Sequence, residues 1–210
     1  MKFVIPAALA GLMTCNSVYA DFIIGGNFGL ATGGEDAASL NNALANEGID
    51  AKASTSGDIR TTWQAYLAYH FLPDWGVELA YVDLGEATIS FEGIDESIED
   101  ILDKIGDNHP RSAQGVKLSA TYRLELNKNL QLQSKLGIFD WDTKYTFSGT
   151  DPFDGAFSSR TVSIDGTDIS FGLGLVHTLT NDISAHLDWD FYNLDEEVVN
   201  TFGFGVSYMF

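Results

Sequence analysis

Apolar and polar residues alternate with a period of two along much of this chain, most clearly in the C-terminal stretch. Positions 202, 204, 206, 208 and 210 carry Phe, Phe, Val, Tyr and Phe, whereas positions 201, 203, 205 and 207 carry Thr, Gly, Gly and Ser. Successive side chains of a β-strand point to opposite faces, so this pattern predicts a strand. A bulky apolar row opposite a small or polar row is typical of a strand between lipid and a crowded lumen.

The same alternation predicts seven earlier strands, which brings the expected number to eight. In each of them one row is mainly apolar, and the other is rich in Ser, Thr, Gln, Gly and charged residues. The seven predicted ranges are 21–30, 59–72, 75–84, 111–126, 130–143, 167–179 and 183–192. An even number of strands lets the first pair with the last, which removes the unpaired edges that a hydrocarbon phase would penalise.

The lengths of the predicted connections divide into two groups. Those after the second, fourth and sixth strands have two to four residues, whereas those after the first, third, fifth and seventh are longer. Short turns at one end and long loops at the other are the arrangement of outer-membrane barrels, with the short turns in the periplasm. Aromatic residues also gather near both predicted strand ends, as they do at membrane interfaces. We therefore expect an all-β, eight-stranded antiparallel up-and-down transmembrane β-barrel.

Residues 1–20 have the features of a secretory signal peptide. Lys2 precedes an apolar stretch over 3–13, and a small residue, Ala20, stands before Asp21. This arrangement predicts cleavage between Ala20 and Asp21, which leaves 21–210 as one barrel domain. The chain's single cysteine, Cys15, lies within the signal, so the mature protein is expected to lack disulfides. A lipoprotein box ending at Cys15 is the alternative, although Thr14 fits it poorly.

The charge of the chain restricts its partners. Thirty acidic residues against eleven basic ones give a formal net charge of −19, which argues against nucleic acid as a partner. Residues 92–107 contain seven acidic residues and one lysine, and their isoleucines and leucine follow helical spacing; 35–48 has a weaker helical pattern. Divalent cations would be able to bridge such carboxylates to lipopolysaccharide phosphates, but no calcium-loop spacing is present. No metal site or cofactor is expected.

Three short motifs resemble strands of the OmpA-like transmembrane domain. They are residues 75–85 (WGVELAYVDLG), residues 113–118 (AQGVKL) and Lys135-Leu136-Gly137 followed by Trp141. The resemblance implies a monomeric, non-enzymatic integral protein of a Gram-negative outer membrane that supports envelope integrity and contacts lipid and lipopolysaccharide. It also implies that the last strand, with Tyr208 and Phe210, is the signal recognised by the barrel-assembly machinery. Full OmpA proteins continue into a peptidoglycan-binding domain, so a cell-wall tether is not expected here.

Several charged residues fall on inward positions of the predicted strands. We expect a lumen cluster of Glu78, Arg123, Lys135, His186 and Asp188. Glu78 and Arg123 each lie four residues from a short turn, so they are its expected pair. The resemblance implies that such ion pairs gate a narrow conducting path. Buried charges must be paired wherever they occur, however, so the cluster is better explained as a plug that fills the lumen.

Catalysis finds little support in the sequence. There is no Gly-x-Ser-x-Gly or His-Glu-x-x-His motif, and none of the four histidines has a hydroxyl and a carboxylate at a recognisable spacing. The alternatives to a structural barrel are a small diffusion porin, an adhesin or ligand-binding barrel acting through its acidic loops, and a lipid-modifying enzyme. Asp83 and Asp140 have outward parity near the long loops. Either they emerge above the hydrocarbon or a bulge shifts the phase there.

Overall fold

The computed structural model describes residues 21–33, 37–46, 48–49, 52–56, 59–86, 88–92, 113–150, 157–195 and 197–210. The predicted signal peptide with Ala20, the predicted helix within 92–107 and His109 lie outside these residues. The side chains of 144–162 are likewise not described.

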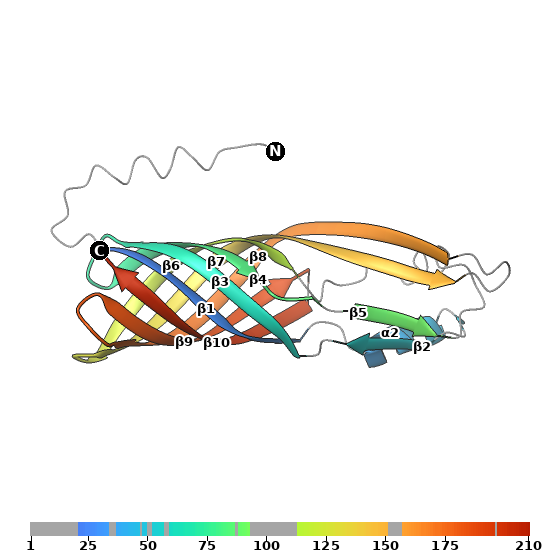
Figure 1. Cartoon of the computed structure of the whole chain (residues 1–210), viewed down its shortest axis with the longest axis horizontal. Helices are drawn as coiled ribbons and strands as arrows, with labels where there is room; N and C mark the ends of the chain where they lie inside the picture. The colour runs from blue at the N-terminus through green and yellow to red at the C-terminus, as the bar shows by residue number, and fades with distance from the viewer. Residues whose placement is uncertain are drawn as a thin grey trace, which may run out of the picture.

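Eight strands form a closed antiparallel barrel in the order β1-β10-β9-β8-β7-β6-β4-β3 (Figure 1). They are β1 (Asp21–Gly33), β3 (Ile59–His70), β4 (Trp75–Asp83), β6 (Gln114–Asn127), β7 (Leu130–Thr150), β8 (Phe157–Thr178), β9 (Ile183–Leu194) and β10 (Glu197–Met209). The barrel closes where β1 pairs with β10, from Ile23 opposite Met209 to Gly33 opposite Val199. The predicted eight-stranded up-and-down barrel is confirmed.

The short connections 71–74, 128–129 and 179–182 lie at one end of the barrel, which we call the short-turn end. The C-terminus lies at this end too (Figure 1). β1, β4 and β7 run toward the opposite end of the barrel before their connections begin, and we call it the long-loop end. The predicted separation of the short turns from these long connections is therefore confirmed.

The outer wall of the barrel is apolar and carries aromatic residues near both ends. At the short-turn end the ring centroids of Phe22 and Tyr69 are 4.8 Å apart. Toward the long-loop end those of Trp63 and Tyr81 are 5.6 Å apart. Between them, outward leucine, isoleucine, valine and phenylalanine side chains are exposed on every strand of the barrel. An exposed apolar surface that encircles the molecule is typical of contact with lipid and not with water.

Near the long-loop end the distribution of apolar and polar side chains between the outer wall and the lumen is reversed. On β7 the buried side chains of Phe139 and Trp141 point into the lumen, while Asp140 between them is exposed. On β4 and just after it, Val82 and Leu84 are buried and Asp83 is partly exposed. At these positions β4 and β7 bury apolar side chains and turn aspartates outward, as the strands of a water-soluble barrel do.

The pairing registers decide between the two explanations offered for Asp83 and Asp140. The β4–β6 and β6–β7 registers run without interruption through both residues, and the β6–β7 shift lies at the other end, between Glu125 and Asn127. No bulge therefore moves either aspartate, and both keep outward parity. Asp83 Oδ1 accepts a hydrogen bond from Gly85 N (2.8 Å) and Asp140 Oδ1 accepts one from Thr167 Oγ1 (2.9 Å).

Two predicted loops at the long-loop end were wrong. Much of 144–166 is strand: β7 and β8 stay paired as far as Thr150 opposite Phe157, and they form a ribbon that projects past the barrel (Figure 1). The predicted long connection after the seventh strand is only 195–196, with Asp195 at a φ of 47°. On β9 and β10 the residues next to this short connection are strand, and their inward side chains Leu194 and Val199 are buried.

Three small elements lie at the same end, beyond the barrel (Figure 1). Helix α2 (Ala37–Asn46) confirms the weak helical pattern over 35–48. Strands β2 (Lys52–Ser56) and β5 (Thr88–Glu92) pair as a separate two-stranded sheet. This sheet was not predicted, because five residues are too few to establish a period. No helix in the described part of the chain is long and apolar enough to cross a membrane.

Candidate functional site in the barrel lumen

The lumen owes its shape to glycines at inward positions of β8. In the pairing register Gly172 lies between Lys135 of β7 and Asp190 of β9. A Cβ atom added at Gly172 would collide with the carboxylate of Asp190, and one added at Gly174 would come within 2.7 Å of Asp188 Oδ1. Because these two glycines have no side chain, the carboxylates of β9 have room to extend through the lumen toward the lysines of β6 and β7.

Lys135 is the centre of the first group of buried charges. Its Nζ lies 3.0 Å from Glu78 Oε2 and 3.3 Å from Glu78 Oε1, and it is 3.7 Å from Asp188 Oδ1. The ammonium also lies 5.2 Å from the centroid of the Tyr66 ring, within the range of a cation–π interaction. The side chains of Lys135 and Glu78 are only 3% and 1% exposed. This is a buried ion pair with a second carboxylate beside it.

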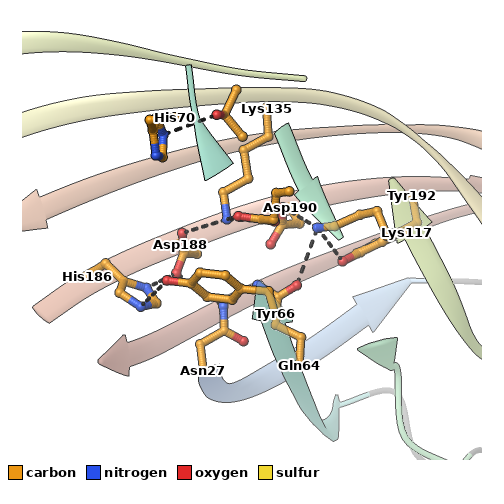
Figure 2. Close-up of polar contacts among 12 residues, drawn as sticks. Asn27, Gln64, Tyr66, His70, Lys117, Lys135, His186, Asp188, Asp190 and Tyr192 are labelled. Atoms are coloured by element: carbon orange, nitrogen blue, oxygen red, sulfur yellow. Dashed lines mark hydrogen bonds and ion pairs between the residues drawn. The ribbon is translucent and has the colours of Figure 1, made fainter. Parts of the chain in front are cut away.

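Lys117 is the centre of a second group, farther along the lumen. Its Nζ is 3.2 Å from Asp190 Oδ1 and donates to Gln64 Oε1 and to the Tyr192 hydroxyl, both at 3.3 Å. Figure 2 shows these three partners converging on the ammonium group, with the Tyr66 ring lying nearby. Both lysines are thus neutralised by a carboxylate, and Lys117 also donates to two neutral acceptors, as buried charges require.

His186 joins the ion pairs to the aromatic side chains. Its Nδ1 contacts Asp188 Oδ2, and its Nε2 lies 3.2 Å from the Tyr66 hydroxyl. Asn27 Nδ2 donates to the same Asp188 oxygen at 3.1 Å (Figure 2). A carboxylate, an imidazole and a hydroxyl in this order are the groups of a catalytic triad. The sequence did not indicate them, because Tyr66 and His186 are 120 positions apart. Here the imidazole is buried, and the three groups form one connected cluster in the lumen.

A layer of apolar side chains lies in the lumen beside this network, toward the long-loop end. We call it the apolar layer. It consists of Ala31, Ala80, Val82, Leu84, Ala113, Phe139, Trp141, Tyr192, Leu194 and Val199. The ring centroids of Phe139 and Tyr192 are 5.1 Å apart, so the layer meets the polar network at Tyr192. The inward parity of Ala80, Val82 and Tyr192 was visible in the sequence, but their gathering with other apolar side chains into one layer was not.

The predicted pair between Glu78 and Arg123 is wrong. Glu78 is bound by Lys135, and the β4–β6 register places Glu78 opposite Ser119. The error arose because distances from two different turns were compared. The β6–β7 hairpin extends past the β3–β4 turn, so Arg123 lies level with that turn and its backbone N–H donates to Asp74 O (2.8 Å). Of the five predicted residues, the structure brings Glu78, Lys135, His186 and Asp188 together and places Arg123 apart.

The other predicted residues lie at the short-turn end. Tyr208 and Phe210 are exposed on the outer wall, with ring centroids 5.8 Å apart, and Asp21 begins β1. Six residues of the network were not in the predicted cluster: Asn27, Gln64, Tyr66, Lys117, Asp190 and Tyr192. Their inward parity was visible in the sequence, but their depth in the lumen was not. Within the described residues, no group of three or more His, Cys, Asp or Glu side chains is placed to hold a metal ion.

Comparisons with known proteins agree with this architecture. The structure resembles that of the outer membrane protein OprG from Pseudomonas aeruginosa, with a TM-score of 0.55, 16% identity, and coverage of 91% of this chain and 96% of that one. It also resembles Ail, the attachment invasion locus protein of Yersinia pestis, in its complex with the heparin analogue sucrose octasulfate. There the TM-score is 0.50 with 16% identity, and 91% of this chain and 99% of that one are covered. At these identities the likeness concerns the fold.

No curated protein matches the sequence. The model of the outer membrane protein beta-barrel domain family matches residues 5–210. Together with the closed barrel and its apolar outer wall, this match means that the chain belongs to that family and resides in the outer membrane of a Gram-negative bacterium.

Proposed function

We propose that this protein is a non-enzymatic barrel that supports the integrity of the outer membrane and keeps its own lumen closed. One observation carries the proposal: two different fillings are stacked in the lumen. The ion-pair network around Lys117 and Lys135 occupies the middle, and the apolar layer follows it toward the extracellular end. An eight-stranded barrel has an interior just wide enough for side chains to fill.

A diffusion porin is less well supported, because a solute would have to pass both fillings. Opening the network would separate buried ion pairs, which is costly when no new partner is supplied. Lys135 has two carboxylates within reach, so an exchange between Glu78 and Asp188 would be the simplest rearrangement for a narrow ion path. The apolar layer lies in series with that path and excludes hydrated ions without any ionic contact, as hydrophobic constrictions of channels do.

Planar-bilayer recording tests the closed lumen. We expect refolded wild-type protein to show no large stable conductance steps. The double variant L84S/L194S, which places hydroxyls in the apolar layer, should raise the mean current about tenfold, because a polar constriction admits water. I59S is the matched control, since Ile59 is exposed on the outer wall at the same end. Large stable steps from the wild-type protein would refute the proposal.

We also propose the partners that this role requires. The protein acts as a monomer, because the closed barrel leaves no unpaired strand edge in the membrane. The barrel-assembly machinery recognises its last strand, where Tyr208 and Phe210 lie exposed beside the seam with β1. Its acidic extracellular loops associate with lipopolysaccharide through divalent cations that bridge carboxylates and phosphates.

Binding to an external surface is a second candidate function, and the projecting β7–β8 ribbon favours it. β6 pairs with β7 only as far as Asp142, and β9 pairs with β8 only as far as Ser170, so within the described residues neither outer edge of the ribbon is paired in the barrel sheet beyond these points. Open strand edges are sites at which another chain can add a strand. The ribbon extends well beyond the rim of the barrel, as do α2, β2 and β5 (Figure 1).

Shortening the ribbon tests this candidate. Residues 144–163 are replaced by Asn-Gly, which joins the paired residues Thr143 and Ile164 by a two-residue hairpin turn. If the ribbon binds, attachment of bacteria displaying the variant to a cultured-cell monolayer should fall severalfold, while the barrel still migrates as a folded species on an unheated gel. A deletion of 93–107 serves as the matched loop control. Unchanged attachment of the shortened variant would exclude the ribbon as the binding element.

A further inference from the structure

A small cavity lies inside the barrel at its periplasmic end. Its volume is about 90 Å³, and strands from both sides of the lumen contribute to its wall. It is lined by Ile23, Arg123, Gln131, Val176, Thr178, Asn181, Asp182, Ser184, Ser207 and Met209. Most of these side chains carry hydroxyl, amide or charged groups, and Arg123 is the only basic one among them.

Arg123 differs from the two lysines of the network in having no counter-ion. Among the residues that the structure describes, no carboxylate lies within 4.0 Å of its guanidinium group, and its buried Nε has no hydrogen-bond partner. Asp21 and Glu78 act on it only at longer range, and Glu78 is held by Lys135. A buried donor without an acceptor, on a charged group, is energetically unfavourable and is uncommon in native proteins.

We propose that this cavity is a binding pocket for a small oxyanion, a phosphate or carboxylate group that enters from the periplasm and pairs with Arg123. The planar guanidinium presents several N–H donors in a fork that matches two oxygens of such a group. The hydroxyls of Ser184 and Ser207 and the amide of Gln131 supply further donors around the same space. The inference does not depend on whether the lumen is closed.

The size of the cavity limits the ligand. Its volume corresponds to about three water molecules at ~30 Å³ each, so it accommodates a single phosphate or carboxylate group and excludes a whole nucleotide or sugar. The one acidic residue in the wall, Asp182, is exposed in the β8–β9 turn, so its carboxylate is hydrated. The remaining negative charge of the protein is screened beyond about 8 Å at physiological ionic strength.

Amide NMR of the refolded chain, residues 21–210, tests the pocket with inorganic phosphate as the probe. The protein is held in maltoside micelles, which contain neither phosphate nor carboxylate, at constant ionic strength near 0.15 M. We expect saturable shifts of the Ser184 and Ser207 amides and of Arg123 Nε–H. R123Q should weaken binding at least about tenfold, because a charge-assisted hydrogen bond is lost. R123K, which keeps the charge but not the fork, should weaken it severalfold.

K128Q is the matched control, because Lys128 is exposed in the neighbouring β6–β7 turn and does not line the cavity. It should bind phosphate as the wild type does. Titration with acetate, and separate spectra in nanodiscs of phosphatidylglycerol without free phosphate, distinguish a free anion from a lipid headgroup as the source. Shifts that grow linearly without saturation, or equal affinities of the wild type and R123Q, would overturn the proposal. Equal weakening by K128Q and R123Q would also overturn it, since it would reduce the effect to general surface charge.

Discussion

Replacing Lys135 with methionine is expected to lower the free energy of unfolding by about 3–5 kcal/mol, the usual effect of removing one partner from a buried ion pair. The variant leaves Glu78 buried without its cation and removes the ammonium that lies 3.7 Å from Asp188 Oδ1. Methionine keeps most of the lysine volume, so a cavity contributes little. Urea unfolding in phospholipid vesicles, followed by the shift in gel mobility between folded and unfolded barrel, measures the effect.

The control for this prediction is K128M, which removes a lysine from the exposed β6–β7 turn and should change stability by no more than about 0.5 kcal/mol. A double variant, K135M with E78M, removes both members of the pair. Because paired removal leaves fewer uncompensated charges, the double variant should be more stable than the sum of the single effects by at least about 1 kcal/mol. A K135M barrel as stable as K128M would mean that the pair does not hold the lumen together.

Adding one methyl group at Gly29 is expected to damage the seam that closes the barrel. A Cβ atom at Gly29 would collide with the carbonyl oxygen of Phe202 and come within 2.6 Å of the Gly203 Cα, both on the neighbouring strand β10. Backbone atoms cannot rotate away, so the two strands would have to separate. We expect G29A to lose about 3 kcal/mol, at the upper end of overpacking effects, and to give a reduced folded fraction on unheated gels.

Gly203 provides an unusually close control, because it is the residue paired with Gly29 across the same seam. A Cβ atom there would meet nothing nearer than the Asn27 side chain at 3.3 Å. G203A should therefore stay within about 1 kcal/mol of the wild type, since alanine also restricts the unfolded chain. Equal losses of stability in G29A and G203A would show that any side chain at the β1–β10 seam is destabilising, whether or not it collides with the backbone of β10.

Strand parity made the barrel predictable from the sequence. The face on which a strand residue lies depends on its position along the strand and not on which strands are adjacent. Residues such as Trp63 and Gln64 could therefore be placed outside and inside without knowledge of the fold. The same parity put Glu78, Lys135, His186 and Asp188 on the inner face, where the structure has them. The short turns were equally visible, because each consists of two to four polar or Pro-containing positions between apolar rows.

The level of each inward residue along the barrel axis was not predictable in the same way. Parity tells which face a residue occupies, but which inward residues meet depends on how far each strand is offset from its neighbours. Glu78 and Arg123 are equally far from their own turns, yet the two hairpins end at different levels. The partner of Glu78 is therefore Lys135, and the second lysine site, at Lys117, was not recognised as part of the cluster. Such offsets are set by the whole closed sheet and leave no local signal.

The boundary at Asp83 and Asp140 has a consequence for the membrane that the protein can occupy. The outward apolar row of β1, from Phe22 to Leu30, spans roughly 27 Å along the strand at ~3.4 Å per residue, or about 20 Å across the bilayer once the strand tilt is included. A thicker hydrocarbon layer would have to submerge the two outward carboxylates, and a thinner one would wet the aromatic rims. The barrel is thus matched to a thin bilayer, such as the bacterial outer membrane, and is mismatched to thicker membranes.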